Sequence, residues 1–165
     1  MNNLEVILVM GVSGTGKTTV SKALAQEMNA IFIDADDFHP QPNVIKMSQG
    51  IPLNDQDRLP WLQAIRAHME VQNSSIVLAC SALKESYREQ LRSNIYNLKV
   101  VVLQASYEVL EGRMRRRTHF MPSSLLKSQL DTLEIPDYGL HISSELQLKQ
   151  VVSKITNYLN HNLWN

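Results

Sequence analysis

The sequence has very little cysteine and no excess of either charge. A single cysteine, Cys80, among 165 residues rules out a disulfide within the chain and is typical of a protein from a reducing cytosol. The 16 Lys and Arg are balanced by 16 Asp and Glu, whereas proteins that wrap nucleic acid normally carry a basic excess. We therefore expect neither a disulfide-stabilised secreted domain nor a nucleic-acid-binding protein.

Long hydrophobic segments are also missing. A membrane helix needs about 20 apolar residues, and no stretch of the sequence approaches that length. The apolar run Val6–Met10 is too short for the core of a signal peptide and is interrupted at once by Gly11. The sequence thus predicts a soluble, cytoplasmic protein without a membrane partner. Its length predicts a single domain over residues 1–165.

Short apolar runs alternate with helical patterns along the chain. The runs are almost uniformly apolar, as expected of strands covered on both faces: Val6–Met10, Ile31–Ile33, Ile76–Ala79, Val100–Leu103 and, more weakly, Leu140–Ile142. Apolar residues at helical spacing follow them: Val20, Leu24 and Met28; Leu62, Ile65 and Met69 after Pro60; Leu83, Tyr87 and Leu91; Leu110 and Met114; and Leu148 to Leu159 after a capping-box pair, Ser144 and Gln147. The pattern predicts an α/β fold with a parallel, five-stranded sheet and helices on both faces.

Two longer segments interrupt this alternation. Residues 38–59 have only a weak helical pattern, and residues 115–122 are basic at their start. Long excursions at the carboxyl ends of parallel strands are where such folds bind ligands. We expect the first segment to cover a substrate, and residues 113–122 to form a mobile lid over a nucleotide.

The residues after the first strand form the most specific motif of the chain. Gly11-Val12-Ser13-Gly14-Thr15-Gly16-Lys17-Thr18 fits G-x-x-x-x-G-K-[ST], between an apolar strand and an amphipathic helix. The glycines let backbone N–H groups surround a phosphate. Lys17 reaches the β- and γ-phosphates, and the Thr18 hydroxyl can ligate Mg²⁺. With Thr19, these residues are the predicted phosphate site of ATP.

A phosphate loop alone does not distinguish a kinase from a GTPase or a motor. The sequence has no N-K-x-D motif for reading guanine. The strand Ile76–Ala79 ends in Cys80-Ser81, where a hydrolytic ATPase would usually place a metal-binding acid. The domain is also small for a motor, so these observations favour a small-molecule kinase.

Acidic residues follow the second strand. Asp34 and Asp36 are two positions apart and would project from one side if the strand geometry continued. One carboxylate, Asp34, can hold a water of the Mg²⁺ shell, and the other, Asp36, can accept the proton of an attacking hydroxyl. The alternative is an acidic turn that caps the next segment.

Further sequence blocks carry a resemblance to a known family. In chain order they are Asp34-Ala35-Asp36, His39-Pro40, Asn43, Lys46-Met47, Gly50, Pro52-Leu53-Asn54-Asp55, Asp57-Arg58, Pro60-Trp61-Leu62, Cys80-Ser81-Ala82-Leu83-Lys84, Tyr87-Arg88, His119-Phe120-Met121-Pro122 and Ser128-Gln129. Together, from about residue 5 to 135, they resemble the gluconate kinase family, within the shikimate- and adenylate-kinase-like group of P-loop kinases. Ala35 stands where that family commonly has glycine, and the segment between Arg117 and His119 is about one residue shorter.

The resemblance implies transfer of the γ-phosphate of ATP to the 6-hydroxyl of D-gluconate, with Mg²⁺, by a homodimer. It implies that Lys17, Asp36 and Arg117 are catalytic. Arg113 and Arg117 would serve ATP, one stacking on adenine and the other meeting the transferred phosphate. His39 and His119 would donate to substrate hydroxyls.

Basic residues are the expected partners of the gluconate carboxylate. Lys84 and Arg88 lie at helical spacing after a strand end, and Arg58 comes from the excursion beside them. Arginine offers a planar fork of donors to a carboxylate, and Lys46 is a further candidate on this side. The alternative for Lys84 and Arg88 is an ordinary solvated basic face.

Two other functions stay open at this stage. One is a different small kinase of the same fold, acting on shikimate or a nucleoside monophosphate; the His39-Pro40 and Cys80–Lys84 blocks argue against it. The other is a nucleotide-binding regulator without chemistry. The presence of Lys17, Asp36 and the lid arginines argues against that reading.

Overall fold

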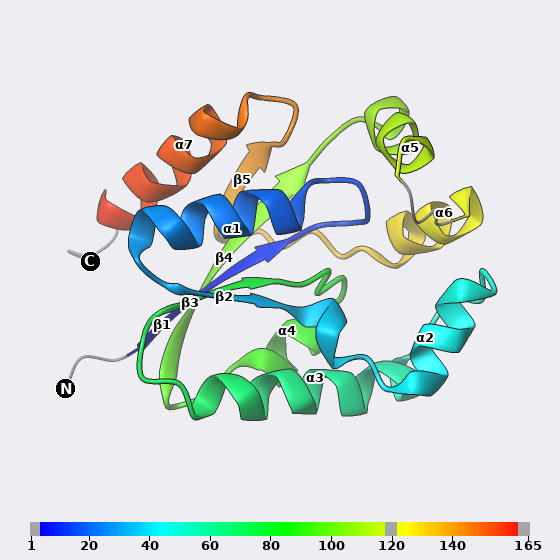
Figure 1. The fold of residues 1–165 in the computed structure, drawn as a ribbon, viewed down its shortest axis with the longest axis horizontal. Helices are drawn as coiled ribbons and strands as arrows, with labels where there is room; N and C mark the ends of the chain where they lie inside the picture. Colours follow the sequence, from blue (N-terminus) through cyan, green and yellow to red (C-terminus); the bar gives the residue numbers. More distant parts are fainter. Residues whose placement is uncertain (1–3, 118–121, 162–165) are drawn as a thin grey trace.

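The computed structural model describes residues 4–117 and 122–161, and these contain the expected parallel sheet. Its five strands lie in the order β2-β3-β1-β4-β5 (Figure 1). Their bounds are Leu4–Met10 for β1, Ile31–Asp34 for β2, Ile76–Ala79 for β3, Tyr96–Gln104 for β4 and Leu140–Ser143 for β5. All adjacent strands pair in parallel, so the predicted fold class, the fifth strand included, is confirmed.

Helices cover both faces of the sheet. The helices α1 (Lys17–Met28) and α7 (Leu148–His161) lie on one face, and α3 (Asp55–Glu70) and α4 (Glu85–Leu91) lie on the other (Figure 1). The remaining elements gather beyond the carboxyl ends of the strands: a 3-10 helix η1 (Ala35–Phe38), α2 (Gln41–Ser48), α5 (Tyr107–Arg115) and α6 (Ser123–Thr132). This end of the sheet is therefore the one on which a site can be built.

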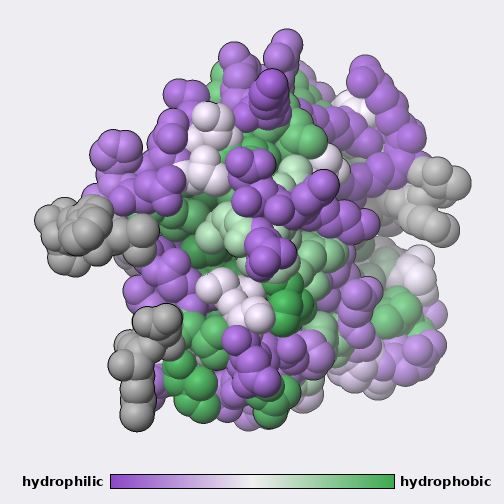
Figure 2. All heavy atoms as spheres, turned by 60° about the vertical axis from the view of Figure 1, so that its left-hand side comes forward, coloured by the Kyte–Doolittle hydropathy of each residue, from purple (hydrophilic) through white to green (hydrophobic). Residues whose placement is uncertain are grey.

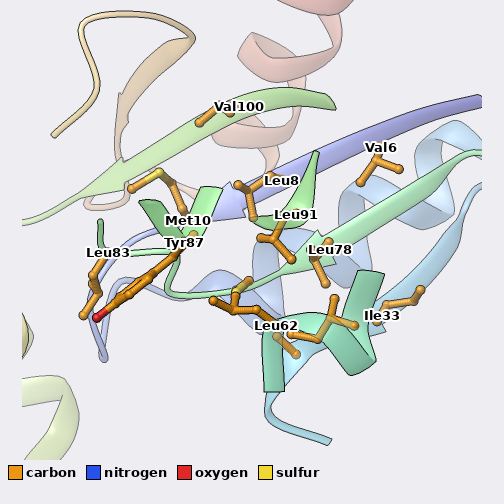
Figure 3. Packing of buried hydrophobic residues seen from close by; sticks show 14 of the residues in the cluster. Val6, Leu8, Met10, Ile33, Leu62, Leu78, Leu83, Tyr87, Leu91 and Val100 are labelled. Atoms are coloured by element: carbon orange, nitrogen blue, oxygen red, sulfur yellow. The ribbon is translucent and has the colours of Figure 1, made fainter. Parts of the chain in front are cut away.

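The central strand β1 is buried on both faces. Val6, Leu8 and Met10 face the layer of α3 and α4, where Figure 3 shows them among other core side chains. Ile7 and Val9 face the layer of α1 and α7. All five are fully buried, which explains why the strand reads as an unbroken apolar run in the sequence.

The helix α3 begins at Asp55, five residues before the Pro60 start that the sequence pattern predicted. Asn54 and Asp57 form a reciprocal capping box: Asn54 Oδ1 accepts from Asp57 N at 2.8 Å, and Asp57 Oδ2 accepts from Asn54 N at 2.9 Å. This cap satisfies backbone donors of the first turn and holds a helix that contains proline, a residue that supplies no N–H to the ladder. Arg58 consequently lies on a helix and not on an irregular excursion.

One helix was not predicted, and one expected cap is corrected. The sequence analysis assigned no helix to the residues of α6. The helix α7 begins at Leu148 with Gln147 before it, and Gln147 O accepts from Val151 N at 3.0 Å. Ser144 does not cap it, because it lies four residues before the helix begins; its hydroxyl accepts a hydrogen bond from Arg113 Nη1 at 3.0 Å instead.

The surface seen in Figure 2 is largely hydrophilic, with hydrophobic residues in groups between polar ones. Within residues 4–117 and 122–161, none of the helices combines the length and the apolar character that crossing a bilayer requires.

The capping box of α3 predicts a stability effect. Replacing Asn54 with Ala removes the acceptor for Asp57 N and should lower the free energy of unfolding by about 1 kcal/mol. Urea denaturation followed by circular dichroism measures the change. Gln56→Ala, at an exposed position in the same turn, is the matched control; if both variants were equally stable, the capping box would contribute nothing.

Candidate active site

Between β1 and α1 the chain turns tightly across the carboxyl end of the sheet. Gly11 has a φ of 150°, and a Cβ there would lie 2.8 Å from the carbonyl oxygen of Leu103, so only glycine fits. The Thr15 hydroxyl donates to Val12 O at 2.8 Å, and Lys17 Nζ donates to the same oxygen at 3.1 Å. The loop is thus fixed in shape, with the ammonium group of Lys17 folded over it.

Three adjoining cavities lie at this end of the sheet. The central cavity, of about 90 Å³, is formed by Ser13, Gly16, Lys17, Thr18, Asp34, Asp36, Ala79 and Arg117. The α2-side cavity, of about 350 Å³, shares Ser13, Lys17 and Asp36 with it. The α7-side cavity, also of about 350 Å³, shares Gly16 and Arg117 with it. The phosphate loop therefore lies between two spaces that are each large enough for a small molecule.

The two aspartates after β2 both reach the central cavity, but for a different reason than strand alternation. The strand ends at Asp34, whose Oδ1 accepts from Asp36 N at 3.0 Å and so turns the chain into η1. Asp34 Oδ2 accepts from the Thr18 hydroxyl at 3.2 Å. Both acids lie beside the phosphate loop, as the sequence analysis expected, and the 3-10 helix η1 places them there.

Asp36 and Lys17 perturb each other in this cleft. The Asp36 side chain is 82 % exposed. Desolvation by the surrounding protein raises the pKa of its carboxyl, and Lys17 acts in the opposite direction. Burial lowers the pKa of Lys17, and Asp36 opposes that shift. A carboxylate with a raised pKa beside an open cavity is suited to accept a proton from a bound hydroxyl.

His39 lies in the α2-side cavity next to Asp36. Its Nε2 is 3.7 Å from Asp36 Oδ1, and its ring stacks on Trp61 with centroids 4.3 Å apart. Burial, and after it the positive charge of Arg58, lowers the pKa of His39 to about 4. The imidazole is therefore neutral at neutral pH, which suits hydrogen bonding to an uncharged polar group.

Of the predicted carboxylate partners, Arg58 lines the α2-side cavity. Its Nη1 donates to Leu53 O at 2.8 Å and to the Tyr87 hydroxyl at 2.9 Å, which fixes the guanidinium at the cavity wall. The two lysines are engaged with acids of α3. Lys46 Nζ lies 2.8 Å from Asp57 Oδ2, and Lys84 Nζ lies 3.0 Å from Asp55 Oδ1.

Arg88 lies behind the cavity wall and not on the acceptor side where the sequence analysis expected it. Its side chain is 1 % exposed. Nη1 donates to Ala82 O at 2.7 Å, and Nη2 donates to Glu134 O at 2.9 Å and pairs with Glu85 at 2.8 Å. The guanidinium thus ties the segment after β3 to the segment after α6, and all its nitrogens have protein partners.

Arg113 and Arg117 line the α7-side cavity together with residues of the phosphate loop. Arg113 Nη1 donates to Gly14 O at 3.1 Å, and Nη2 donates to Ser144 O at 2.8 Å. Arg117 lines both the α7-side and the central cavity. His119 and residues 118–121 of the expected lid lie outside the described residues, so the closing motion stays a prediction.

Sequence reasoning missed the contribution of α6. Gln129 lines the α2-side cavity, and its Oε1 accepts from Ser13 N of the phosphate loop at 2.7 Å. The block Ser128-Gln129 was the available signal, but without a helix assigned there it carried no role.

Oxygen ligands for a metal are few at this site. Across the described ranges, 4–117 and 122–161, the structure contains no cluster of three or more His, Cys, Asp or Glu placed to hold an ion. The Thr18 hydroxyl and the Asp34 carboxylate are hard oxygen donors beside the phosphate loop. They fit Mg²⁺, which keeps several waters and takes further ligands from nucleotide phosphates.

The chain matches known proteins over most of its length. A family model described as an AAA domain matches residues 6–136. The thermosensitive gluconokinase of Escherichia coli (strain K12) is 46% identical over 156 residues, which cover 92% of this chain and 83% of that protein. The gluconokinase of Gluconobacter oxydans (strain 621H) is 50% identical over 134 residues, covering 79% and 75%.

Solved structures agree with these matches. The crystal structure of a gluconokinase from Sinorhizobium meliloti 1021 is 43% identical, covers 99% of this chain and 98% of that chain, and superposes with a TM-score of 0.88. The shikimate kinase from Acinetobacter baumannii in complex with shikimate is 18% identical, covers 99% and 97%, and has a TM-score of 0.66. At that identity it shares the fold alone.

The burial of Arg88 predicts a structural role. Arg88→Ala should lower the free energy of unfolding by about 3 kcal/mol, because it leaves buried carbonyl oxygens without donors. Arg92→Ala, at the C-cap of the same helix with a more exposed side chain paired to Glu89, should cost less than about 1 kcal/mol. Denaturant unfolding compares the two; equal losses would show that the buried bonds of Arg88 do not stabilise the fold.

Proposed function

Because the chain belongs to the gluconokinase family, we propose that its cleft transfers the γ-phosphate of ATP to the 6-hydroxyl of D-gluconate, giving 6-phospho-D-gluconate and ADP. The chain is an enzyme, an ATP-dependent kinase that phosphorylates gluconate. The geometry that best supports the transfer is the position of Lys17 and Asp36, which line both the central and the α2-side cavity.

The nucleotide is proposed to lie across the central and α7-side cavities. Its β- and γ-phosphates would be held by the N–H groups of the phosphate loop and by Lys17. Binding would restore the positive charge that burial disfavours on Lys17. Arg113 is already tied to Gly14 O and would border the nucleoside. Arg117 reaches the central cavity and would stabilise charge on the transferred phosphate.

A magnesium ion would be held by the Thr18 hydroxyl and, through a water, by Asp34. It would neutralise charge on the β- and γ-phosphates. Asp34 also anchors η1 through Asp36 N, so the residue that would order the metal's water also places the proposed base.

The acceptor is proposed to lie in the α2-side cavity. Asp36 would take the proton of the 6-hydroxyl as its oxygen forms a bond to the γ-phosphorus, while the bond from that phosphorus to the β–γ bridging oxygen breaks and ADP leaves. Arg58 would bind the carboxylate, and His39 a hydroxyl. Lys46, Lys84 and His119 stay candidates for further contacts, whereas Arg88 is assigned to support the wall.

Two expectations stay proposals: a homodimer, which rests on the family resemblance, and a cytoplasmic location, which rests on the sequence composition. One assay distinguishes gluconate kinase activity from the alternatives, which are a shikimate or nucleoside monophosphate kinase and a non-catalytic regulator. Coupled measurement of ADP release should respond to gluconate and not to shikimate or nucleoside monophosphates; no response to any acceptor would support the regulator.

The proposed base can be tested by an isosteric change. Asp36→Asn keeps the shape but cannot accept a proton at neutral pH, so kcat should fall by roughly 10²- to 10⁴-fold while ATP affinity barely changes. In the unaltered enzyme the acid limb of kcat/KM should lie above the ordinary carboxyl range, because the Asp36 pKa is raised and activity is lost as pH falls through it.

Asp37→Asn, at the next exposed residue of η1, is the control and should be active. An unchanged kcat in Asp36→Asn would remove Asp36 from the mechanism. A collapse of ATP binding would make it chiefly a metal-site residue.

Carboxylate recognition can be tested with a neutral analogue. Arg58→Ala should reduce the preference for gluconate over glucitol in kcat/KM by about ten- to a hundredfold, since one charge-assisted hydrogen bond is lost. Arg58→Lys should restore only part of it, because an ammonium lacks the planar fork. Arg66→Ala, on the same helix in a pair with Glu70, is the matched control. A preference unchanged by Arg58→Ala would place carboxylate recognition elsewhere.

A further inference from the structure

The buried amide of Asn43 has a fixed orientation. Asn43 lies on α2 and is 2 % exposed. Its Nδ2 donates to Asp57 O at 2.9 Å and contacts His39 Nδ1 at 3.3 Å. A backbone carbonyl oxygen can only accept, so Asp57 O requires the nitrogen of the amide, and not its oxygen, on this side. The same nitrogen therefore presents its second hydrogen to His39.

The contact with Asn43 decides which nitrogen of His39 carries the proton. A ring nitrogen that accepts a hydrogen bond is unprotonated, and in a neutral imidazole the proton then lies on the other nitrogen. The low pKa of His39, about 4, keeps the ring neutral. Its Nε2–H is consequently the group that lies 3.7 Å from Asp36 Oδ1, at the junction of the α2-side and central cavities.

The plane of the imidazole is also held. Trp61 is 1 % exposed and stacks on His39 with an angle of 13° between the rings. The indole Nε1 donates to Ala35 O at 2.6 Å, and Ala35 directly precedes Asp36 in η1. The histidine ring, the indole and the turn that carries Asp36 are thus linked, and the direction of Nε2–H relative to the Asp36 carboxylate is set by the fold.

We propose that Asn43 is a positioning residue that locks His39 as the Nε2–H tautomer, so that His39 donates a hydrogen bond to a substrate hydroxyl beside Asp36. The separation of 3.7 Å between Nε2 and Asp36 Oδ1 exceeds a direct hydrogen bond, and one oxygen atom can contact both groups. That oxygen must accept from His39 and donate to Asp36, which a hydroxyl does and an ether or ketone oxygen does not. The identity of the hydroxyl rests on the proposed function; the tautomer does not.

The tautomer can be read directly by nuclear magnetic resonance. Long-range ¹H–¹⁵N spectra of the ¹⁵N-labelled protein, without substrates at neutral pH, distinguish protonated from unprotonated ring nitrogens. His39, assigned by its loss in His39→Gln, should show a protonated Nε2 and an unprotonated Nδ1. A proton on Nδ1, alone or together with one on Nε2, would overturn the proposal. Because no substrate is present, this result is independent of gluconate phosphorylation.

A double-mutant cycle tests the positioning role. Asn43→Ala should change the His39 nitrogen signals and lower kcat/KM for gluconate by about fivefold, and in the His39→Gln background it should cost less than about twofold, because a glutamine amide donates without a tautomer. The KM for ATP should be unchanged. Gln41→Ala, exposed on the same helix, is the control.

Two outcomes of the cycle would contradict the proposal. Equal losses in both backgrounds would show that Asn43 acts only through packing of α2. Unchanged His39 signals and unchanged kcat/KM in Asn43→Ala would show that it does not position the ring. If Asn43→Ala does not fold, the spectrum of the unaltered protein still decides the tautomer.

Discussion

The cleft depends on the pairing of β1 with a strand on each side. Residues Val6 to Val9 of β1 lie in register with Ile76 to Ala79 of β3, and the whole of β1 pairs with β4. Parallel strands in register end at the same edge, so the segments that follow them meet there. The phosphate loop follows β1, the proposed base follows β2, and the α5 arginines follow β4. The close approach of Gly11 to Leu103 O shows how tightly this edge is packed.

Burial decides what the charged residues around this edge do. Arg58 lies on α3 and Arg88 on α4, yet Arg58 lines the α2-side cavity and Arg88 is buried behind it. Arg88 donates to backbone carbonyls, so its hydrogen bonds connect the segment after β3 to the segment after α6 behind the α2-side cavity. Arg58 is held by Leu53 O and the Tyr87 hydroxyl, which leaves its direction fixed before substrate arrives. Such preorganisation reduces the entropy lost on binding.

The sequence predicted the five strands because their central parts, buried on both faces, are apolar. The first residues of β4, which include Asn97 and Lys99, were not predicted. The phosphate loop was also readable, since its glycines and Lys17 are required by local geometry. Helical spacing, by contrast, placed Lys84 and Arg88 on one face but could not show that the Arg88 side chain turns inward. Helix α6 has only three apolar residues, Leu125, Leu126 and Leu130, too few to stand out as a helical pattern, and Gln129 was missed with it.

Other parts of the site arise only from contacts between distant segments. The orientation of His39 depends on Asp57 O through Asn43, a backbone atom that no sequence pattern identifies. Residues of this kind are recognised from hydrogen-bond partners and burial, and not from their spacing along the chain.

The central claim is phosphoryl transfer between the loop after β1 and a hydroxyl in the α2-side cavity. Its most direct test is identification of the product by ³¹P and ¹³C nuclear magnetic resonance after incubation with ATP, Mg²⁺ and D-gluconate. The account predicts equal amounts of ADP and a phosphate monoester whose phosphorus couples to carbon 6 of gluconate. Release of inorganic phosphate with ADP, at a rate independent of gluconate, would contradict it.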